Sequence, residues 1–396
     1  MSVFAEVVGQ DAVTELLASV ARRARENGDG LTHAWLFAGP PGCGRSIAAR
    51  AFAAALHCRS PDGVGCGRCH ECRTVLAGSH PDVVVVRPAG LSLGVAEARE
   101  LVARAALAPT VSRWQVVIVE DADRLTEGAA NVLLKAIEEP APRTIWLLCV
   151  PSPHDLVPTI RSRCRLVTLR TPNPHAIAQV LIERDGIEPE LATAAARAAS
   201  GHIGRARRLA TDAQARARRR AVLDAAAQLA GAPTLAESLR IAAELVDAAT
   251  AEAGEETETR DAAEAAALRE ALGVEAGSGG RRPRGSAGAF RDLEARQKSR
   301  ATRTQRDALD RILGDLAAFF RDVLVLQLSG TEDAVANVDV LSAIRASAGR
   351  STRTDTLRRL EAIMECRAAI EANANPLIAF EAMAIALSDS GGRTSG

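Results

Sequence analysis

From the start of the chain to Pro172, short runs of apolar, often β-branched residues alternate with segments of helical periodicity. This alternation predicts a parallel α/β sheet that is covered by helices on both faces. The predicted strands are Ala34–Ala38, Val83–Arg87, Gln115–Val119, Ile145–Val150 and Leu166–Leu169. The predicted helices between them include Ser46–Leu56, Ala96–Ala106 and Ala129–Glu138.

From Pro174 onward the pattern of apolar positions is helical, and no further strand is predicted. A segment rich in glycine and proline, 273–288, predicts a flexible loop inside this helical region. The expected domains are an α/β domain over 1–172, a small helical domain over 173–212 and an all-α domain over 213–396. The helices of the small domain are predicted at His175–Asp185, Glu188–Ser200 and Gly204–Ala210.

Composition narrows the class of protein. The 396 residues carry 49 basic and 49 acidic side chains, so no global positive charge indicates nucleic-acid binding. Aromatic residues make up only 3%, which argues against an aromatic platform for stacking single-stranded bases. The chain has neither an apolar run of membrane-spanning length nor a signal peptide near Met1, so we expect a soluble, cytoplasmic protein without a membrane partner.

A glycine-rich segment with the sequence GPPGCGRS follows the first predicted strand and begins a helix. Gly39, Gly42 and Gly44 let backbone N–H groups surround a phosphate, and the helix N-terminus favours the anion. The phosphate-loop pattern expects Lys and then Ser or Thr at its end, whereas this chain has Arg45 and Ser46. Arginine is larger and planar, so the segment predicts a degenerate nucleotide loop. A glycine-rich turn without a ligand is the alternative.

Two carboxylates follow the apolar strand Gln115–Val119. In a nucleotide site the usual order is Asp, which holds magnesium through water, and then Glu, which orients the attacking water. Here Glu120 precedes Asp121, so each side chain differs by one methylene from the required length. Because a misplacement of about 1 Å can lower a rate about a hundredfold, this order predicts a defective site. Solvated acidic residues at a strand end are the alternative.

Four of the eight cysteines lie close together in the sequence. Cys58, Cys66, Cys69 and Cys72 stand in a glycine-rich segment, and four thiolates can close a tetrahedral zinc site without an open position. A redox or disulfide role is the alternative, although clustering in a chain without a secretion signal favours metal. Three further cysteines have apolar neighbours and are expected to be buried, namely Cys43, Cys149 and Cys366.

Several motifs together resemble the nucleotide-binding domain of bacterial replicative clamp loaders, within the AAA+ class. The segments that carry the resemblance, beside the glycine-rich loop, are Val7–Gln10, His33–Phe37, Asn131–Pro140 and Arg161–Cys164. The resemblance implies a parallel-sheet AAA+ P-loop domain with an inserted zinc module at 58–72, a helical lid domain and an all-α collar domain. It also implies that Arg163 is an arginine finger, which completes the ATP site of a neighbouring subunit. An exposed arginine without this role is the alternative.

Two further positions of that family are altered. The polar residue expected at the end of the fourth strand falls at Val150 or Pro151, and the lid arginine aligns with Gly204, one step before Arg205. With Arg45 and the reversed carboxylates, these changes predict little or no ATP hydrolysis and make ATP and Mg²⁺ binding at the chain's own site doubtful. Nucleotide binding without turnover stays open, because Ser46 and the glycines are present.

The combination implies a non-hydrolysing stator of the DNA polymerase III clamp loader. Its expected partners are gamma/tau and delta subunits and, through the assembly, the sliding clamp and primer-template DNA. Two alternatives stay open, an active AAA+ motor subunit of the same loader and a zinc-bearing DNA-binding adaptor. The basic stretches Arg216–Arg220, Arg281–Arg284 and Arg296–Arg306 are interpreted as solvated helix faces and a disordered loop, with weak phosphate contact as the alternative.

Overall fold

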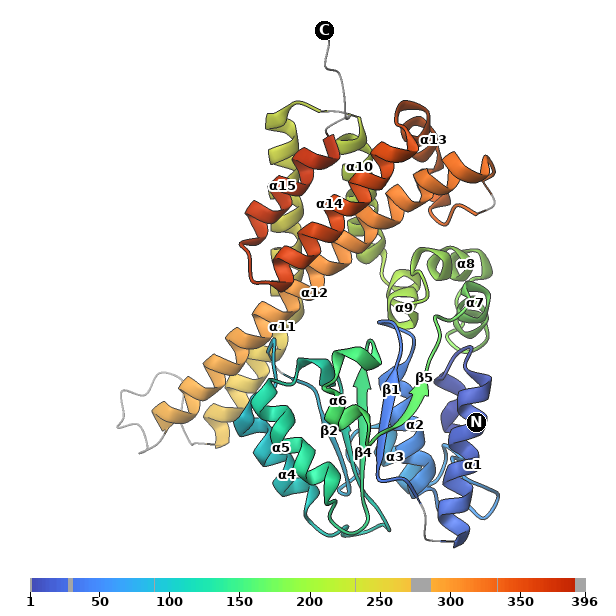
Figure 1. The fold of residues 1–396 in the computed structure, drawn as a ribbon, viewed down its shortest axis with the longest axis vertical. Coiled ribbons are helices and arrows are strands. Elements are labelled where there is room, and N and C mark those ends of the chain that lie inside the picture. The colour runs from blue at the N-terminus through green and yellow to red at the C-terminus, as the bar shows by residue number, and fades with distance from the viewer. Residues whose placement is uncertain are drawn as a thin grey trace. The chain divides into compact units, whose positions relative to one another are not determined.

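Parallel strands form the centre of the first unit of the chain. In the computed structural model, which describes residues 2–27, 31–88, 90–231, 233–271, 286–332 and 334–388, a five-stranded sheet has the order β2-β3-β4-β1-β5. The predicted parallel sheet is confirmed, with strand ends within one residue of the expected positions (Figure 1). The strands are β1 (Ala34–Ala38), β2 (Val83–Val86), β3 (Gln115–Val119), β4 (Thr144–Val150) and β5 (Arg165–Thr168).

Side chains alternate between two apolar layers along each central strand. In β1, Trp35 and Phe37 face the layer built with α1 and α2, whereas Leu36 faces the layer built with α4 and α5. All three side chains are fully buried, as expected for a parallel sheet with helices on both faces. The covering elements are η1 (Val3–Glu6), α1 (Asp11–Asn27), α2 (Arg45–His57) and α3 (His70–Leu76) on one face, and α4 (Val95–Ala105), α5 (Glu127–Glu138) and α6 (Pro158–Arg161) on the other.

Three short helices follow the sheet and belong to the same unit, which extends to Thr211. The connection is held by Gln10, whose side chain both donates to the Arg170 carbonyl at 2.6 Å and accepts from the Arg170 N–H at 3.1 Å. Arg184 adds an ion pair of 2.6 Å with Glu6. The helices are α7 (Pro174–Glu183), α8 (Pro189–Ala198) and α9 (Ile203–Thr211), and we call them the lid.

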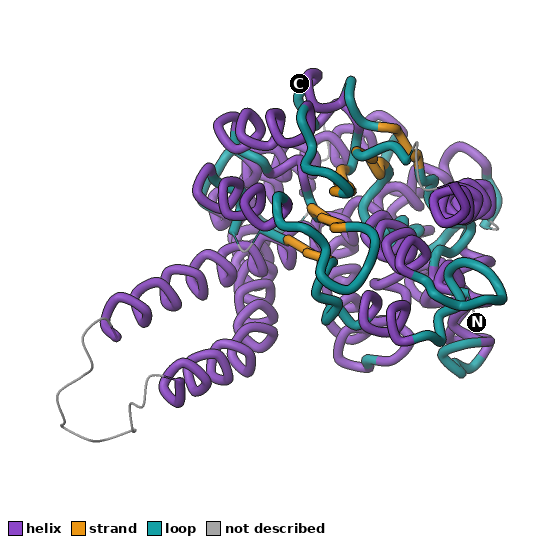
Figure 2. Tube along the Cα trace, turned by 90° about the horizontal axis from the view of Figure 1, so that it is seen from below, coloured by secondary structure: helices purple, strands orange, loops and turns teal. Residues whose placement is uncertain are grey.

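The second unit begins at Asp212, and its regular elements are all helices among the described residues. Figure 2 shows helices in purple and strands in orange. Its core contains the fully buried Phe319, Phe320 and Phe380. Helices α11 and α12 lie against each other, and their connected ends extend beyond α14 and α15 (Figure 1). The elements are α10 (Ala213–Ala230), α11 (Leu235–Ala271), α12 (Ser286–Ser329), η4 (Val338–Val340), α13 (Leu341–Arg350), α14 (Arg353–Glu371) and α15 (Pro376–Ser388).

The predicted flexible loop over 273–288 is partly corrected. Residues 273–285 lie outside the described residues, but Ser286 already begins α12, so the last three residues of the predicted loop are helical. A single glycine such as Gly288 costs a helix only about 1 kcal/mol relative to alanine. The contact between α11 and α12 offsets that cost, which the glycine content alone could not indicate.

Candidate functional site

The glycine-rich loop connects the end of β1 to the start of α2 at the carboxyl edge of the sheet. Gly42 and Gly44 have φ angles of 80° and 98°, in the region that favours glycine. At Gly39, a β-carbon would lie 2.6 Å from the carbonyl oxygen of Leu169, so that position also excludes a side chain. The glycine pattern found in the sequence is therefore what this loop conformation requires.

The lid rests directly on this loop. A β-carbon at Gly42 would lie 2.1 Å from Cγ of His202, so the imidazole ring occupies the space beside the Gly42 backbone. The N–H of Ile203 donates to the Gly42 carbonyl at 3.2 Å. Nδ1 of His202 accepts the N–H of Arg205 at 3.1 Å, which fixes the ring at the start of α9. The turn between α8 and α9 thus covers the loop.

His202 was not among the residues predicted from the sequence. A histidine in an exposed turn between two short helices belongs to no motif. The only available signal was Gly201, whose φ of 88° marks a turn that directs the next residue, but a turn does not reveal what it faces.

Arg45 stands where a lysine would end the loop. Burial raises the pKa of Asp123 and Asp121 adds to this rise, whereas the Arg45 guanidinium lowers it. Burial also raises the pKa of the Cys149 thiol on β4.

Each of the two candidate carboxylates has an arginine partner within the chain. Glu120 is buried, and its Oε1 lies 2.9 Å from a guanidinium nitrogen of Arg50 on α2. Asp121 has a φ of 52°, and its Oδ2 lies 3.9 Å from Nε of Arg87. The backbone turns sharply between them, so the two carboxylates diverge toward different cations. This arrangement does not fit a magnesium site shared by the pair.

The remaining positions of the expected nucleotide site provide no polar side chain toward it. Val150 ends β4 fully buried, and its carbonyl accepts the N–H of Gly39 at 3.2 Å. Gly204 lies in the first turn of α9, followed by Arg205, whose N–H is bound by the His202 ring.

Arg163 lies just after α6, and its guanidinium is held by neighbours on α5 and α6. One terminal nitrogen lies 2.6 Å from Oε1 of Glu138, the last residue of α5. The other donates to the carbonyl of Thr159 at 2.8 Å and to the hydroxyl of Ser162 at 3.3 Å. The side chain is 41% exposed, so solvent reaches the guanidinium. Arg161, two residues earlier, instead contacts Nδ1 of His154 at 3.0 Å.

The four clustered cysteines come together where α2 ends and α3 begins. The sulfurs of Cys58, Cys66, Cys69 and Cys72 all lie within 4.8 Å of one another. Zinc with bonds of about 2.3 Å to tetrahedral sulfurs places those sulfurs about 3.8 Å apart, so the cluster fits a metal of this kind. Backbone amides already point at the sulfurs, because Cys69 and Arg68 donate to Cys66 at 3.3 and 3.4 Å.

Electrostatics at the cluster favour thiolate at one position. Hydrogen bonds from the Cys69 and Arg68 amides lower the pKa of the Cys66 thiol to about 6. His57 is not a ligand, because its ring nitrogens face the carbonyl oxygens of Ala53 at 2.8 Å and Trp114 at 3.1 Å. The grouping that could hold a metal among the described residues consists of the four cysteines alone.

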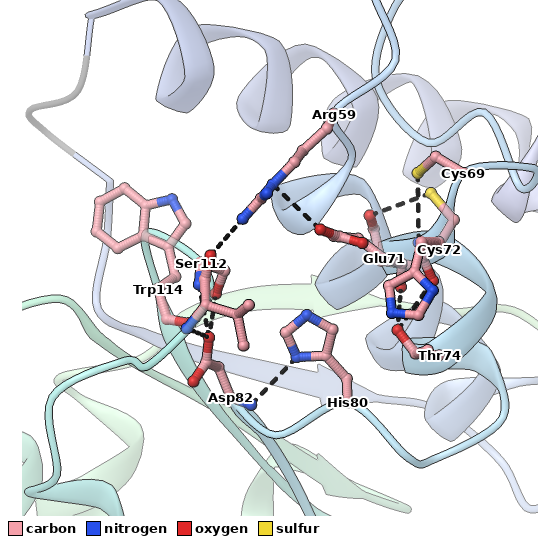
Figure 3. A network of polar contacts seen from close by, with 12 residues as sticks. Arg59, Cys69, Glu71, Cys72, Thr74, His80, Asp82, Ser112 and Trp114 are labelled. Carbon is pink, nitrogen blue, oxygen red and sulfur yellow. Dashed lines mark hydrogen bonds and ion pairs between the residues drawn. The ribbon is translucent and has the colours of Figure 1, made fainter.

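A polar network joins the cysteine segment to the sheet (Figure 3). Arg59 pairs with Glu71 of α3 at 3.2 Å and also donates to the carbonyl of Val111 in the loop before β3. On the other side, the Val3 N–H donates to the carbonyl of Gly65 at 2.9 Å. The segment is therefore anchored to both η1 and the sheet.

The basic stretch of α12 is paired with acidic residues of α11. Arg300 forms ion pairs with Asp261 and with Glu264, the latter at 2.6 Å. The hydrogen bond from Arg300 lowers the pKa of Glu264 to about 2. Arg303 is buried, and Nε of Arg303 lies 3.8 Å from Asp307. The interpretation as simply solvated faces is therefore corrected for Arg300 and Arg303. It is also corrected for Arg219, which is buried and lies 3.3 Å from Asp315. Arg281–Arg284 lie outside the described residues.

Among the described residues, no helix is both long enough and apolar enough to span a membrane.

Comparison with known proteins identifies the family of the α/β part. The family described as DNA polymerase III, delta subunit, matches residues 10–173. The delta' subunit of DNA polymerase III from Bacillus subtilis is 36% identical over 164 residues, which cover 41% of this chain and 50% of the relative. The corresponding subunit of Pseudomonas aeruginosa is 39% identical over 151 residues, 37% of this chain and 45% of the relative. Residues 10–173 of this chain are thus similar to the delta-prime subunits of the clamp-loader family.

The same region is also similar to subunits of the other type in this family. The gamma/tau subunit from Mycobacterium tuberculosis is 37% identical over 189 residues, 46% of this chain and 32% of the relative. The chain thus spans about half or less of the length of these relatives.

Solved structures with a similar fold include the Holliday junction branch migration motor RuvB of Thermotoga maritima, at 19% identity and a TM-score of 0.38, covering 51% of this chain and 60% of that chain. A DNA polymerase III gamma subunit-related protein of the same organism covers 96% of this chain and 99% of its own, at 15% identity and a TM-score of 0.38.

Proposed function

We propose that this chain is a delta-prime-type stator of the DNA polymerase III clamp loader, working with gamma/tau and delta subunits. In this proposal Arg163 completes the ATP site of a neighbouring subunit, while the chain's own nucleotide site does not hydrolyse ATP. The assembly loads a sliding clamp onto primer-template DNA. The observation that carries the proposal is the contrast between an accessible guanidinium at Arg163 and a nucleotide loop covered by His202.

The chemistry of Arg163 suits a function in trans. A guanidinium always carries its charge and presents several donors in a plane, which matches the equatorial oxygens of a phosphoryl group in transfer. Such an arginine supplied by a neighbour raises the rate of related reactions by about 10³- to 10⁵-fold. Arg163 lies on the short turn after α6 with solvent access, so it can approach another subunit without unfolding its surroundings.

The chain's own site is unsuited to turnover. Glu120 and Asp121 are each paired with a different arginine. A Mg²⁺ ion bound there would have to displace these partners, so we derive no catalytic step at this site.

The cysteine cluster is proposed to hold one structural Zn²⁺. Bound zinc would close the site with four thiolates and supply no open position for catalysis. Cys58 and Cys72 belong to α2 and α3 or their ends, so their shared ion would hold the two helices together. Arg59 and Gly65 then connect this module to the sheet and to η1.

Reconstitution with gamma/tau and delta subunits of the same organism tests the proposal. The Arg163→Ala variant should fold and join the assembly, but ATP turnover at the site it contacts should fall by about 10³-fold. Arg161→Ala is the matched control, since Arg161 faces His154 and is not expected to reach the neighbour. Assayed alone, the wild-type chain should release little or no phosphate. Unchanged turnover with Arg163→Ala, or motor-like turnover by the lone chain, would refute the stator role.

A further inference from the structure

Both terminal nitrogens of Arg163 are occupied within its own chain. One lies 2.6 Å from the Glu138 carboxylate, and the other donates to Thr159 and Ser162. These contacts use both N–H groups of one terminal nitrogen and one N–H group of the other. A phosphoryl group that is bound by both terminal nitrogens of Arg163 therefore replaces at least one of the present partners.

Of these partners, only Glu138 carries a charge. The carbonyl of Thr159 and the hydroxyl of Ser162 are neutral and belong to the same turn as Arg163, so they can move with it. Glu138 belongs to a different helix and stays in place. Charge-assisted hydrogen bonds are about twice as strong as neutral ones, so the Glu138 contact contributes most to holding the guanidinium.

The position of Glu138 is electrostatically unusual. It is the last residue of α5, where the helix dipole disfavours a negative charge, and Glu139 adds a second carboxylate beside it. The Arg163 guanidinium offsets this unfavourable charge. Glu138 and Arg163 are 39% and 41% exposed, which places the pair among ion pairs that contribute little to folding.

From this geometry we propose that Glu138 is a positioning residue that keeps the Arg163 guanidinium in a stowed state, from which a neighbour's triphosphate releases it. The proposal rests on the proposed function of Arg163. The triphosphate replaces the carboxylate as the anionic partner, so one charge-assisted contact is exchanged for another. Because the exposed Glu138–Arg163 ion pair is weak, little free energy is needed to release the guanidinium from Glu138. When the neighbouring subunit holds no nucleotide, the guanidinium stays on Glu138.

The exchange makes Glu138 a competitor of the transition state. The free energy that holds the guanidinium on Glu138 must be given up before Arg163 can contact the transferred phosphoryl group. A stronger contact with Glu138 therefore reduces the net stabilisation of the transition state by Arg163. Neutralising Glu138 should therefore raise turnover, whereas a residue that simply supports the fold would lower it or leave it unchanged. An exposed pair contributes about 0.2–1 kcal/mol, which corresponds to an increase of about 1.5- to 5-fold.

The test compares Glu138→Gln with Glu139→Gln in the reconstituted assembly. The two variants remove the same charge from adjacent exposed positions, but only Glu138 contacts Arg163. We expect Glu138→Gln to raise kcat and kcat/KM for ATP together, because the finger acts in the transition state. Glu139→Gln should leave both close to wild type. In the Arg163→Ala background, Glu138→Gln should have no effect on turnover.

The outcomes separate this inference from the proposed function. If Arg163→Ala lowers turnover but Glu138→Gln does not raise it, the finger role stands and the stowed state is refuted. The stowed state is likewise refuted if Glu139→Gln raises ATP turnover equally, or if Glu138→Gln still raises turnover in the Arg163→Ala background. Either result would mean that turnover responds to the net charge of this surface and not to the contact with Arg163. If Arg163→Ala changes nothing, the proposed function itself fails.

Discussion

The ring of His202 lies against Gly42 so closely that a β-carbon on the glycine would be 2.1 Å from Cγ of the histidine. The two residues come from the lid and from the phosphate-binding type of loop, and Ile203 adds a hydrogen bond to the Gly42 carbonyl. The contact therefore couples the lid to the loop.

A substitution at Gly42 measures this contact. Gly42→Ala should destabilise the α/β unit by about 3 kcal/mol, from the left-handed φ together with overpacking against the ring. Gly78→Ala is the matched control, because Gly78 has a φ of 74° but no atom within 4 Å of its β-carbon position, so only about 1 kcal/mol is expected. Urea unfolding gives both values.

The same measurement in a His202→Ala background isolates the ring. Without the imidazole, Gly42→Ala should cost about as much as Gly78→Ala, within about 0.5 kcal/mol. Equal costs for Gly42→Ala and Gly78→Ala in the wild-type background would mean that the ring does not cover the loop in solution.

The cysteine cluster predicts a metal-dependent stability. Cys66→Ser should lower zinc content from one ion per chain to well below one and reduce the thermal midpoint, because the pairing of α2 with α3 loses its shared ion. Cys164→Ser is the control, since Cys164 is half-buried like Cys66 but lies outside the cluster. Elemental analysis and thermal unfolding, with and without a chelator, provide the readouts. A wild-type chain free of zinc, or an equal loss with Cys164→Ser, would contradict the assignment.

Asp82 predicts a stability that depends on pH. Its carboxylate accepts hydrogen bonds from the N–H groups of Thr110, Val111 and Ser112 at 2.6 to 2.9 Å and from two of their hydroxyls (Figure 3). Burial raises the pKa of Asp82, but these hydrogen bonds outweigh burial and hold the pKa well below its usual value. The contribution of Asp82 to stability is therefore complete above the ordinary aspartate pKa of about 4 and is lost as the pH falls below it.

Asp82→Asn tests this dependence. Asparagine replaces one carboxylate oxygen by an NH₂ group, so some of the surrounding N–H and O–H donors lose their acceptor. This should lower the free energy of unfolding by about 3 kcal/mol at pH 7. The difference from wild type should shrink as the pH is lowered below about 4, because the unfolded wild-type chain then binds a proton at Asp82 that the folded chain does not. Urea unfolding at pH 7 and pH 3 follows both. Asp62→Asn, at an exposed position, controls for net charge, and a pH-independent difference at Asp82 would argue against the low pKa.

The sequence sufficed for the features that depend on local pattern. Apolar runs predicted the strands, the glycines of the loop matched a backbone with positive φ, and cysteine spacing predicted the sulfur cluster. These signals lie within short segments, where strand period, helix period or ligand spacing leaves few alternatives.

Features built from distant residues could not be predicted in this way. Glu120 forms an ion pair with Arg50, 70 positions away in the sequence, and Gly42 packs against His202, which is farther still. Nothing in either segment indicates its partner, because the pairing depends on how helices pack on the sheet. The stowed state of Arg163 was missed for the same reason, although both Glu138 and Arg163 stood in segments that carried the family resemblance.

The connection at Gln10 has a mechanical consequence. Its side chain forms hydrogen bonds with both the N–H and the carbonyl of Arg170. In addition, Arg184 forms an ion pair with Glu6, and the His202 ring packs against Gly42. The connection between sheet and lid is thus held at three separate places, so a displacement of the lid would be transmitted to the sheet instead of being absorbed between them.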